Sequence, residues 1–193
     1  MAQLKMLLID SPELIVPAPA GYFIRTHNPE NGGFNEDADG WAVACEKLCG
    51  RILSREEVKK MMLDDPNCGP NRIFYICRRS DGRICATATA NCNPAWPTLH
   101  MVGAANEFAG LGLSRSVCAA ATNYLINYGF RRFGLSTDDF RVPAVKTYLR
   151  LGYRPWYWQD DMQERWRKLI DDFGYDRADY FAYSALFDRR ISI

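Results

Sequence analysis

The chain has 193 residues, 48% hydrophobic and 24% charged, and its 24 basic and 23 acidic residues leave a formal net charge of +1. This composition is typical of a folded globular domain and excludes a disordered, collagen-like or coiled-coil chain. The balanced charge gives no electrostatic reason to expect binding to nucleic acid or to a membrane surface. No apolar run approaches the roughly 20 residues of a membrane-spanning helix.

The N-terminal segment and the cysteines both favour a cytoplasmic protein. Residues 1–10 break their apolar run too soon for a secretory signal peptide. The seven cysteines include no Cys-x-x-Cys pair, and only two histidines accompany them. We therefore expect small, reduced core cysteines and no metal site.

The hydrophobic periodicity and the turn residues predict a mixed α/β chain. Its prolines make residues 1–20 an N-terminal arm, which leads into one domain over residues 21–193. The predicted elements are, in chain order, a strand (21–26), a loop (28–39), a helix ending at Gly50, a helix opened by a capping box (54–57), a strand (72–78), a strand (83–90), a loop (91–97), a strand (98–104), a helix (112–128), a strand (133–137), a helix (from about 143), a strand (153–158), a helix (stripe 162–173) and a strand (180–187).

The segment from Leu99 to Arg115 carries the clearest functional signal. A strand runs into a turn that contains Gly110 and Gly112, and the turn leads directly into a helix. Glycines let a ligand approach the backbone closely, and the first amides of a helix have no partner within it, so this turn suits a pyrophosphate. Arg115 adds a cationic contact. Walker A and Rossmann fingerprints are absent, and glycines used only for packing remain the alternative.

The sequence downstream of this turn supports the first interpretation. Residues 72–155 resemble the GNAT superfamily of acyl-CoA-dependent N-acyltransferases. The family's loop, Arg/Gln-x-x-Gly-x-Gly/Ala, falls on residues 109–114, and its second motif, an alanine followed by Tyr-x-x-x-Gly-Phe/Tyr, falls on Ala144 and residues 148–153. The stretch 136–141 and the overall layout look most like mycothiol-synthase-type members.

The resemblance implies an α/β (α+β) single-domain fold, with a mixed, largely antiparallel central sheet and helices on both faces. It also implies that acetyl-CoA donates its acetyl group to a primary amine of a small molecule or peptide. One strand would pair with the pantetheine arm, an N–H near Val102 would polarise the thioester carbonyl, and the amides of residues 110–114 would hold the pyrophosphate. The implied cofactor-binding residues are Met101, Val102, Gly103, Ala104, Ala109, Gly110, Leu111, Gly112, Leu113, Ser114 and Arg115.

Among the catalytic residues that the resemblance implies, Tyr148 matches the family's general acid, which protonates the leaving thiolate. The alternative is that Tyr148 is a tyrosine of the hydrophobic core. The family often places a carboxylate where this chain has Thr98, which cannot take a proton from the amine. His100 faces the same side of the strand as Thr98, and the pKa of an ordinary histidine suits a base. The alternative is that His100 is a hydrogen-bonded core residue without a catalytic role. Asp138 and Asp139 are further candidates, with helix capping as their alternative, and a bound water is the remaining option.

Two departures from the family pattern leave a second class of function open. Ala109 replaces an Arg or Gln that contacts the phosphates, and Ser114 replaces a Gly or Ala. The backbone amides survive both changes, so we expect cofactor binding to be weakened but retained, with a decayed site as the alternative. The alternatives are a non-catalytic acyl-CoA-binding or regulatory domain and a plain structural α/β domain. Neither the acceptor nor the oligomeric state can be deduced from the sequence, although a homodimer is the commonest soluble assembly.

Overall fold

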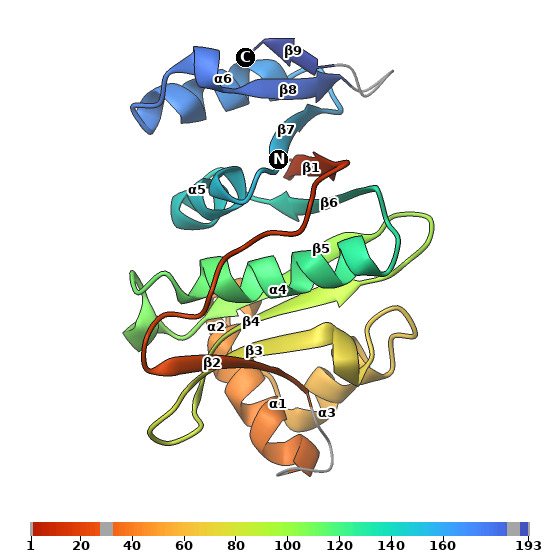
Figure 1. The fold of residues 1–193 in the computed structure, drawn as a ribbon, viewed down its shortest axis with the longest axis vertical. Coiled ribbons are helices and arrows are strands. Elements are labelled where there is room, and N and C mark those ends of the chain that lie inside the picture. The colour runs from red at the N-terminus through yellow and green to blue at the C-terminus, as the bar shows by residue number, and fades with distance from the viewer. Residues whose placement is uncertain (1, 28–32, 185–189, 193) are drawn as a thin grey trace. The chain divides into compact units, whose positions relative to one another are not determined.

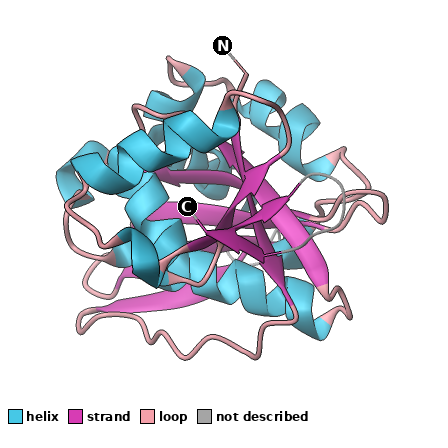
Figure 2. Ribbon diagram, turned by 90° about the horizontal axis from the view of Figure 1, so that it is seen from above, coloured by secondary structure: helices cyan, strands magenta, loops and turns pink. Residues whose placement is uncertain are grey.

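The computed structural model describes residues 2–27, 33–184 and 190–192, and the chain divides into two compact units. We call residues 12–130 the central unit, and residues 1–11 together with 131–193 the terminal unit. The chain contains both helices and strands, which are interspersed along it (Figure 1), and this confirms the mixed α/β class predicted from the sequence (Figure 2). In the described part of the chain, every helix is too short or too polar to cross a membrane.

The central unit contains an antiparallel sheet whose strands follow one another in chain order. The strands are β2 (Tyr22–Thr26), β3 (Ile73–Arg78), β4 (Ile84–Asn91) and β5 (Thr98–Ala104). Its helical segments are α1 (Gly33–Ala44), α2 (Glu46–Cys49), α3 (Arg55–Val58), the π-helical turn η1 (Lys59–Leu63), η2 (Pro70–Arg72), η3 (Asn106–Phe108) and α4 (Leu113–Asn127).

Helices cover both faces of this sheet because the side chains of β3 alternate between them. Ile73 and Tyr75 face α1 and belong to one buried cluster with its Trp41. Phe74 points to the opposite face, where its ring centre lies 5.9 Å from that of Tyr124 in α4. The sheet is therefore buried on both sides, in agreement with the predicted placement of the helices.

The terminal unit joins the two ends of the chain in one mostly antiparallel sheet. The strand order is β6 (Arg132–Thr137), β1 (Leu4–Ile9), β7 (Arg154–Tyr157), β8 (Phe181–Ser184) and β9 (Arg190–Ser192), and only the β7–β8 pair is parallel. Its helical segments are α5 (Val142–Arg150), α6 (Met162–Asp172) and η4 (Arg177–Asp179).

Two predicted helix boundaries agree closely with the structure. The hydroxyl of Ser54 accepts a hydrogen bond from the Glu57 amide at 3.3 Å, and the Glu57 carboxylate accepts one from the Ser54 amide at 2.8 Å. This capping box begins α3, as the sequence predicts. Gly50 ends α2 in the left-handed conformation, with φ of 76°.

Other predicted elements need correction. The expected arm contains β1, which the sequence analysis did not count as a strand, and residues 12–20 belong to the central unit. The expected loop over 28–39 is helical from Gly33 onward, while residues 28–32 lie outside the described part of the chain. The last predicted strand ends at Ser184; residues 185–189 are not described, and β9 follows them.

Candidate functional site

A β-bulge interrupts β5 in the middle of the predicted cofactor strand. Thr89 pairs with His100, but Thr87 pairs with Gly103, so Met101 and Val102 together oppose a single residue of β4. Met101 has φ of 45°, a left-handed conformation that non-glycine residues seldom adopt. A bulge leaves its extra residue outside the ladder, so the backbone here has polar groups to offer a ligand.

The bulge is supported from behind by the junction of α1 and α2. A Cβ atom on Gly103 would lie only 2.4 Å from the carbonyl oxygen of Ala44, so a larger residue cannot fit. The Sγ of Cys45 lies 4.0 Å from the carbonyl oxygen of Met101. Burial raises the pKa of the Cys45 thiol well above its usual value, which makes it a packing residue and not a nucleophile.

The glycine-containing turn before α4 forms an open cradle of backbone amides. Gly110 and Gly112 are left-handed, with φ of 81° and 74°, and open space surrounds the position of a Cβ atom on either. Gly112 precedes α4, and no side chain caps that helix. Backbone hydrogen bonding resumes at Arg115, whose amide donates to Gly112 at 3.1 Å, while the amides of residues 110–114 donate to no other described residue.

The side chains around this cradle contribute unequally. Ala109 is exposed and too short to reach a ligand, whereas Arg115 is an exposed cation in the first turn of α4. Leu111 is exposed, but Leu113 is buried in the core, so Leu113 offers only its backbone. The geometry fits a diphosphate held by amides and a helix N-terminus, because unpaired N–H groups bind anions.

His100 lies on the face of the central sheet that α1 covers. His100 pairs with Thr89 of β4, and Thr89 in turn pairs with Ile73 of β3. Paired residues lie on the same face of a sheet, so His100 shares the face of Ile73. The imidazole keeps its contact with solvent. Desolvation by the surrounding protein lowers its pKa, and the carboxylate of Asp65 partly opposes that shift. Neutral imidazole, the form that accepts protons, is therefore favoured.

The other two catalytic candidates belong to the terminal unit. Tyr148 is buried in α5, with its ring centre 6.2 Å from that of Tyr153. The Asp138 carboxylate accepts hydrogen bonds from Arg141 Nε at 2.9 Å and from Gln3 Nε2 at 3.3 Å.

Neither aspartate of the pair after β6 caps a helix, which corrects the alternative considered for them. Arg141 precedes α5, and its side chain makes no capping hydrogen bond. Asp138 is paired with Arg141 instead, and Asp139 accepts from Arg165 Nε at 3.0 Å. Pro143 in the first turn starts the helix without a polar cap, because its missing N–H needs no partner there.

The sequence analysis missed a buried ionic cluster between β2 and α1. Asp37 accepts a hydrogen bond from Arg25 at 3.0 Å, and its Oδ2 lies 2.7 Å from the Nδ1 of His27. The Nε2 of His27 is buried and has no hydrogen-bond partner among the described residues. It borders a small apolar cavity of about 10 Å³, lined in part by Phe34 and Met62. Asp37 lay in a segment expected to be a loop, so nothing in the sequence pointed to this cluster.

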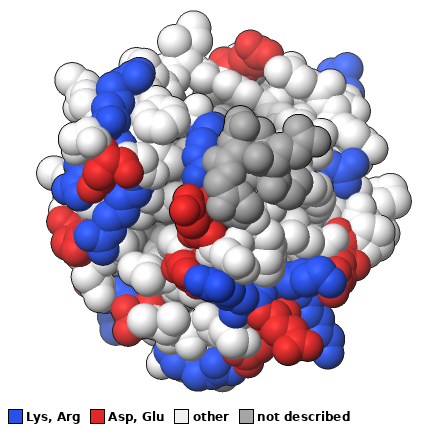
Figure 3. Space-filling model, turned by 90° about the horizontal axis from the view of Figure 1, so that it is seen from below, with Lys and Arg blue, Asp and Glu red and all other residues white. Residues whose placement is uncertain are grey.

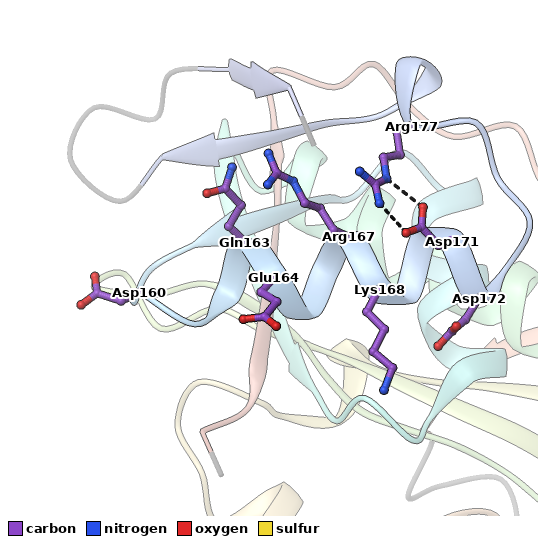
Figure 4. A pocket seen from close by; sticks show the side chains of 8 residues that line it. All are labelled: Asp160, Gln163, Glu164, Arg167, Lys168, Asp171, Asp172 and Arg177. Carbon is purple, nitrogen blue, oxygen red and sulfur yellow. Dashed lines mark hydrogen bonds and ion pairs between the residues drawn. The ribbon is translucent and has the colours of Figure 1, made fainter.

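A groove in the terminal unit lies along α6 and η4 and has a volume of about 660 Å³ (Figure 4). Its lining alternates in charge, and Arg177 Nε donates to Asp171 at 2.7 Å within it. The lining residues are Asp160, Gln163, Glu164, Arg167, Lys168, Asp171, Asp172 and Arg177. Figure 3 shows another face on which acidic and basic side chains are likewise intermingled. Mixed, exposed charge of this kind selects no particular ligand.

Comparison with known proteins identifies the family to which this chain belongs. The family model described as "Acetyltransferase (GNAT) family" matches residues 40–153, more than half of the chain. The chain therefore belongs to the GNAT acetyltransferase family, which confirms the resemblance seen in the sequence.

Individual relatives agree with this family. Over 64 residues the chain is 38% identical to a mycothiol acetyltransferase of Pseudarthrobacter chlorophenolicus, a match that covers 33% of this chain and 20% of that protein. Among solved structures, a GCN5-related N-acetyltransferase from Sphaerobacter thermophilus aligns with a TM-score of 0.61 at 19% identity, over 80% of this chain and 49% of that one. A similar protein from Kribbella flavida gives 0.57 at 20% identity, over 80% and 55%. The chain thus spans about half the length of these solved relatives.

Proposed function

We propose that the chain transfers an acetyl group from acetyl-CoA to a primary amine of a small molecule or peptide. The observation that carries this proposal is the open cradle at residues 110–114, where unpaired amides meet the N-terminus of α4. Membership of an acetyltransferase family supports the same conclusion. The cradle retains its amides although Ala109 supplies no side-chain contact.

The backbone of β5 supplies the second part of the proposed site. The bulge at Met101 and Val102 frees polar backbone groups in the strand proposed to pair with the pantetheine arm. In this proposal an N–H near Val102 donates to the thioester oxygen, on which negative charge grows as the amine attacks. Gly103 and Ala104 continue the strand beyond the bulge.

Proton transfer is assigned to side chains. Tyr148 is proposed to protonate the leaving thiolate, and either His100 or Asp138 is proposed to take the proton of the amine. Asp138 is held in an ion pair with Arg141, so its carboxylate is already engaged by a cation. His100 has no such cationic partner among its described neighbours, so it is the preferred base.

A non-catalytic acyl-CoA-binding domain is the second candidate. Two observations favour it: Ala109 is exposed without a side chain that could hold phosphate, and Thr98 stands where the family often has a carboxylate. Such a domain would bind acetyl-CoA through the same cradle and release no free CoA.

Calorimetric titration with acetyl-CoA and with 3′-dephospho-CoA tests the cradle first. We expect micromolar binding of acetyl-CoA, and a weaker signal for the dephospho analogue points to a basic contact such as Arg115. An amine panel with detection of the free thiol then separates the two candidates. Binding with turnover supports the enzyme, binding without turnover supports the non-catalytic domain, and no binding at millimolar acetyl-CoA contradicts both.

A further inference from the structure

A carboxylate-centred turn closes one end of the central sheet near His100. Asp65 follows η1, and its Oδ1 accepts hydrogen bonds from the amide and the Nδ2 of Asn67, at 2.8 Å and 3.1 Å. Its Oδ2 accepts from the Nδ2 of Asn91, at 3.2 Å, and from the thiol of Cys68, at 3.5 Å. The second carboxylate oxygen therefore reaches the last residue of β4.

The register of the sheet brings this carboxylate toward His100. Asn91 pairs with Thr98, and Thr89 pairs with His100, so these four residues lie on one face of the β4–β5 ladder. Asn91 is two residues from Thr89, so it is the diagonal neighbour of His100 across the ladder. Diagonal neighbours are close enough for long or aromatic side chains to interact, and Asn91 holds the Asp65 carboxylate on this side of His100.

The same face offers an unused hydroxyl. The Oγ1 of Thr89 is buried and has no hydrogen-bond partner among the described residues. Buried polar groups without partners are uncommon, and this oxygen belongs to the residue that pairs with His100 on the same face of the sheet. Among the described charged groups, Asp65 is the one whose field acts on His100.

We propose that Asp65 is a positioning residue for His100, stabilising the imidazolium that forms when His100 takes a proton from the acceptor amine. This inference rests on the acetyltransfer proposed above.

Proton transfer and acyl transfer follow one another in the proposed step. The acceptor ammonium gives one proton to an imidazole nitrogen of His100, which leaves a neutral amine and an imidazolium beside the Asp65 carboxylate. The nitrogen lone pair then forms a bond to the thioester carbon, and the C–S bond breaks with its electron pair on sulfur. The thiolate gains a proton from the proposed acid, the N-protonated amide gives its extra proton to the conjugate base of that acid, and the imidazolium releases its proton to solvent.

Because the chain has only two histidines, NMR can follow the ring protons of His100 and His27 separately. Asp65→Asn removes the charge but keeps an oxygen for the Asn67 amide. We expect the pKa of His100 to fall by about half a unit or more, since a nearby anion favours the imidazolium. The control is Asp64→Asn, whose exposed carboxylate pairs with Lys59 at 3.5 Å. An unchanged His100 pKa in Asp65→Asn, or an equal shift in the control, overturns the pairing.

Kinetics with the best amine of the panel test the role in transfer. In Asp65→Asn the ascending limb of kcat/KM against pH should move to lower pH and kcat should fall, while Asp65→Glu restores the profile. Thr89→Val, which removes an uncharged polar group from the same face, should leave the limb in place. Turnover with an unchanged profile in Asp65→Asn overturns this inference alone. A wild-type protein that binds acetyl-CoA but acetylates no amine overturns the proposed function as well.

Discussion

The Nδ1 atom of His27 lies 2.7 Å from the Oδ2 of Asp37, inside a buried cluster that Arg25 completes. Burial alone would raise the pKa of Asp37, but the hydrogen bonds from His27 and Arg25 outweigh it and lower the pKa from 3.8 to about 2. A carboxylate whose pKa is lowered by folding stabilises the fold at any pH above its unfolded value. That contribution is lost as the pH falls from about 4 through about 2.

Asp37→Asn tests this cluster. We expect the free energy of unfolding at pH 7 to fall by about 3 kcal/mol, because the buried His27 and the half-buried Arg25 lose their anion. The difference from wild type should shrink as the pH approaches 2. Denaturant unfolding measures both quantities, and Asp39→Asn, which removes an exposed carboxylate of the same helix, is the control with a much smaller effect. Equal losses in the two variants would contradict the role of burial.

Gly112→Ala tests the cradle and has a matched control in Gly82→Ala. Both glycines are left-handed, with φ of 74° and 72°, and both have open space at the Cβ position. The two changes should therefore cost similar stability, about 1 kcal/mol each. Only the methyl group at position 112 would meet a bound pyrophosphate, so we expect at least about a tenfold loss of acetyl-CoA affinity there, equivalent to about 1.4 kcal/mol. Equal affinities, measured by calorimetry, would remove the cradle from the binding site.

Tyr148→Phe tests the proposed general acid. We expect kcat to fall by about 100-fold or more while the Kd for acetyl-CoA changes little, because only a proton donor is removed. Tyr153→Phe is the control, since this buried tyrosine packs edge-on against Tyr148. Steady-state assays with thiol detection give the rates. Full activity in Tyr148→Phe would leave this side chain a role in packing only.

His100→Gln and Asp138→Asn distinguish the two candidate bases. If His100 is the base, its replacement should lower kcat/KM by about 100-fold at neutral pH, and Asp138→Asn should retain nearly all activity. The Asp138 change removes the pair with Arg141, so its unfolding should be measured in parallel. The reverse order of activities would transfer the role to Asp138.

Gly103→Ala tests the close packing behind the bulge. The new Cβ would lie 2.4 Å from a backbone carbonyl oxygen, which cannot move aside as a side chain can. We expect a loss of about 1–3 kcal/mol in the free energy of unfolding. Thermal unfolding of the variant measures the loss, and a wild-type melting temperature would show that the junction of α1 and α2 yields easily.

The sequence predicted most elements of both units because their hydrophobic patterns are local. It failed over residues 33–39 of α1, where Asn35 and Asp37 are typical of a loop. Burial of Trp41 against the sheet overrides those weak preferences. It also missed β1, because the partners that make this apolar stretch a strand lie far away in the chain.

Some features of the candidate site could likewise be predicted from the sequence, and others could not. The two glycines of the cradle were recognisable, since a left-handed turn before a helix requires such residues. The bulge at Met101 was not, because methionine carries no preference for φ of 45° and the bulge arises from the register with β4. Asp65 was overlooked because its relation to His100 depends on pairing across two strands.

The placement of β1 has a consequence for folding during synthesis. Leu4 pairs with Thr137 and Lys5 with Trp156, so β1 lies between two strands that are made long after it. Closing such a long loop is slow and entropically costly, and the terminal sheet cannot assemble until β7 has emerged. Until then, the buried apolar side chains of β1 are exposed to solvent and to chaperones, which makes Leu4–Ile9 the segment most vulnerable to misassociation in a nascent or truncated chain.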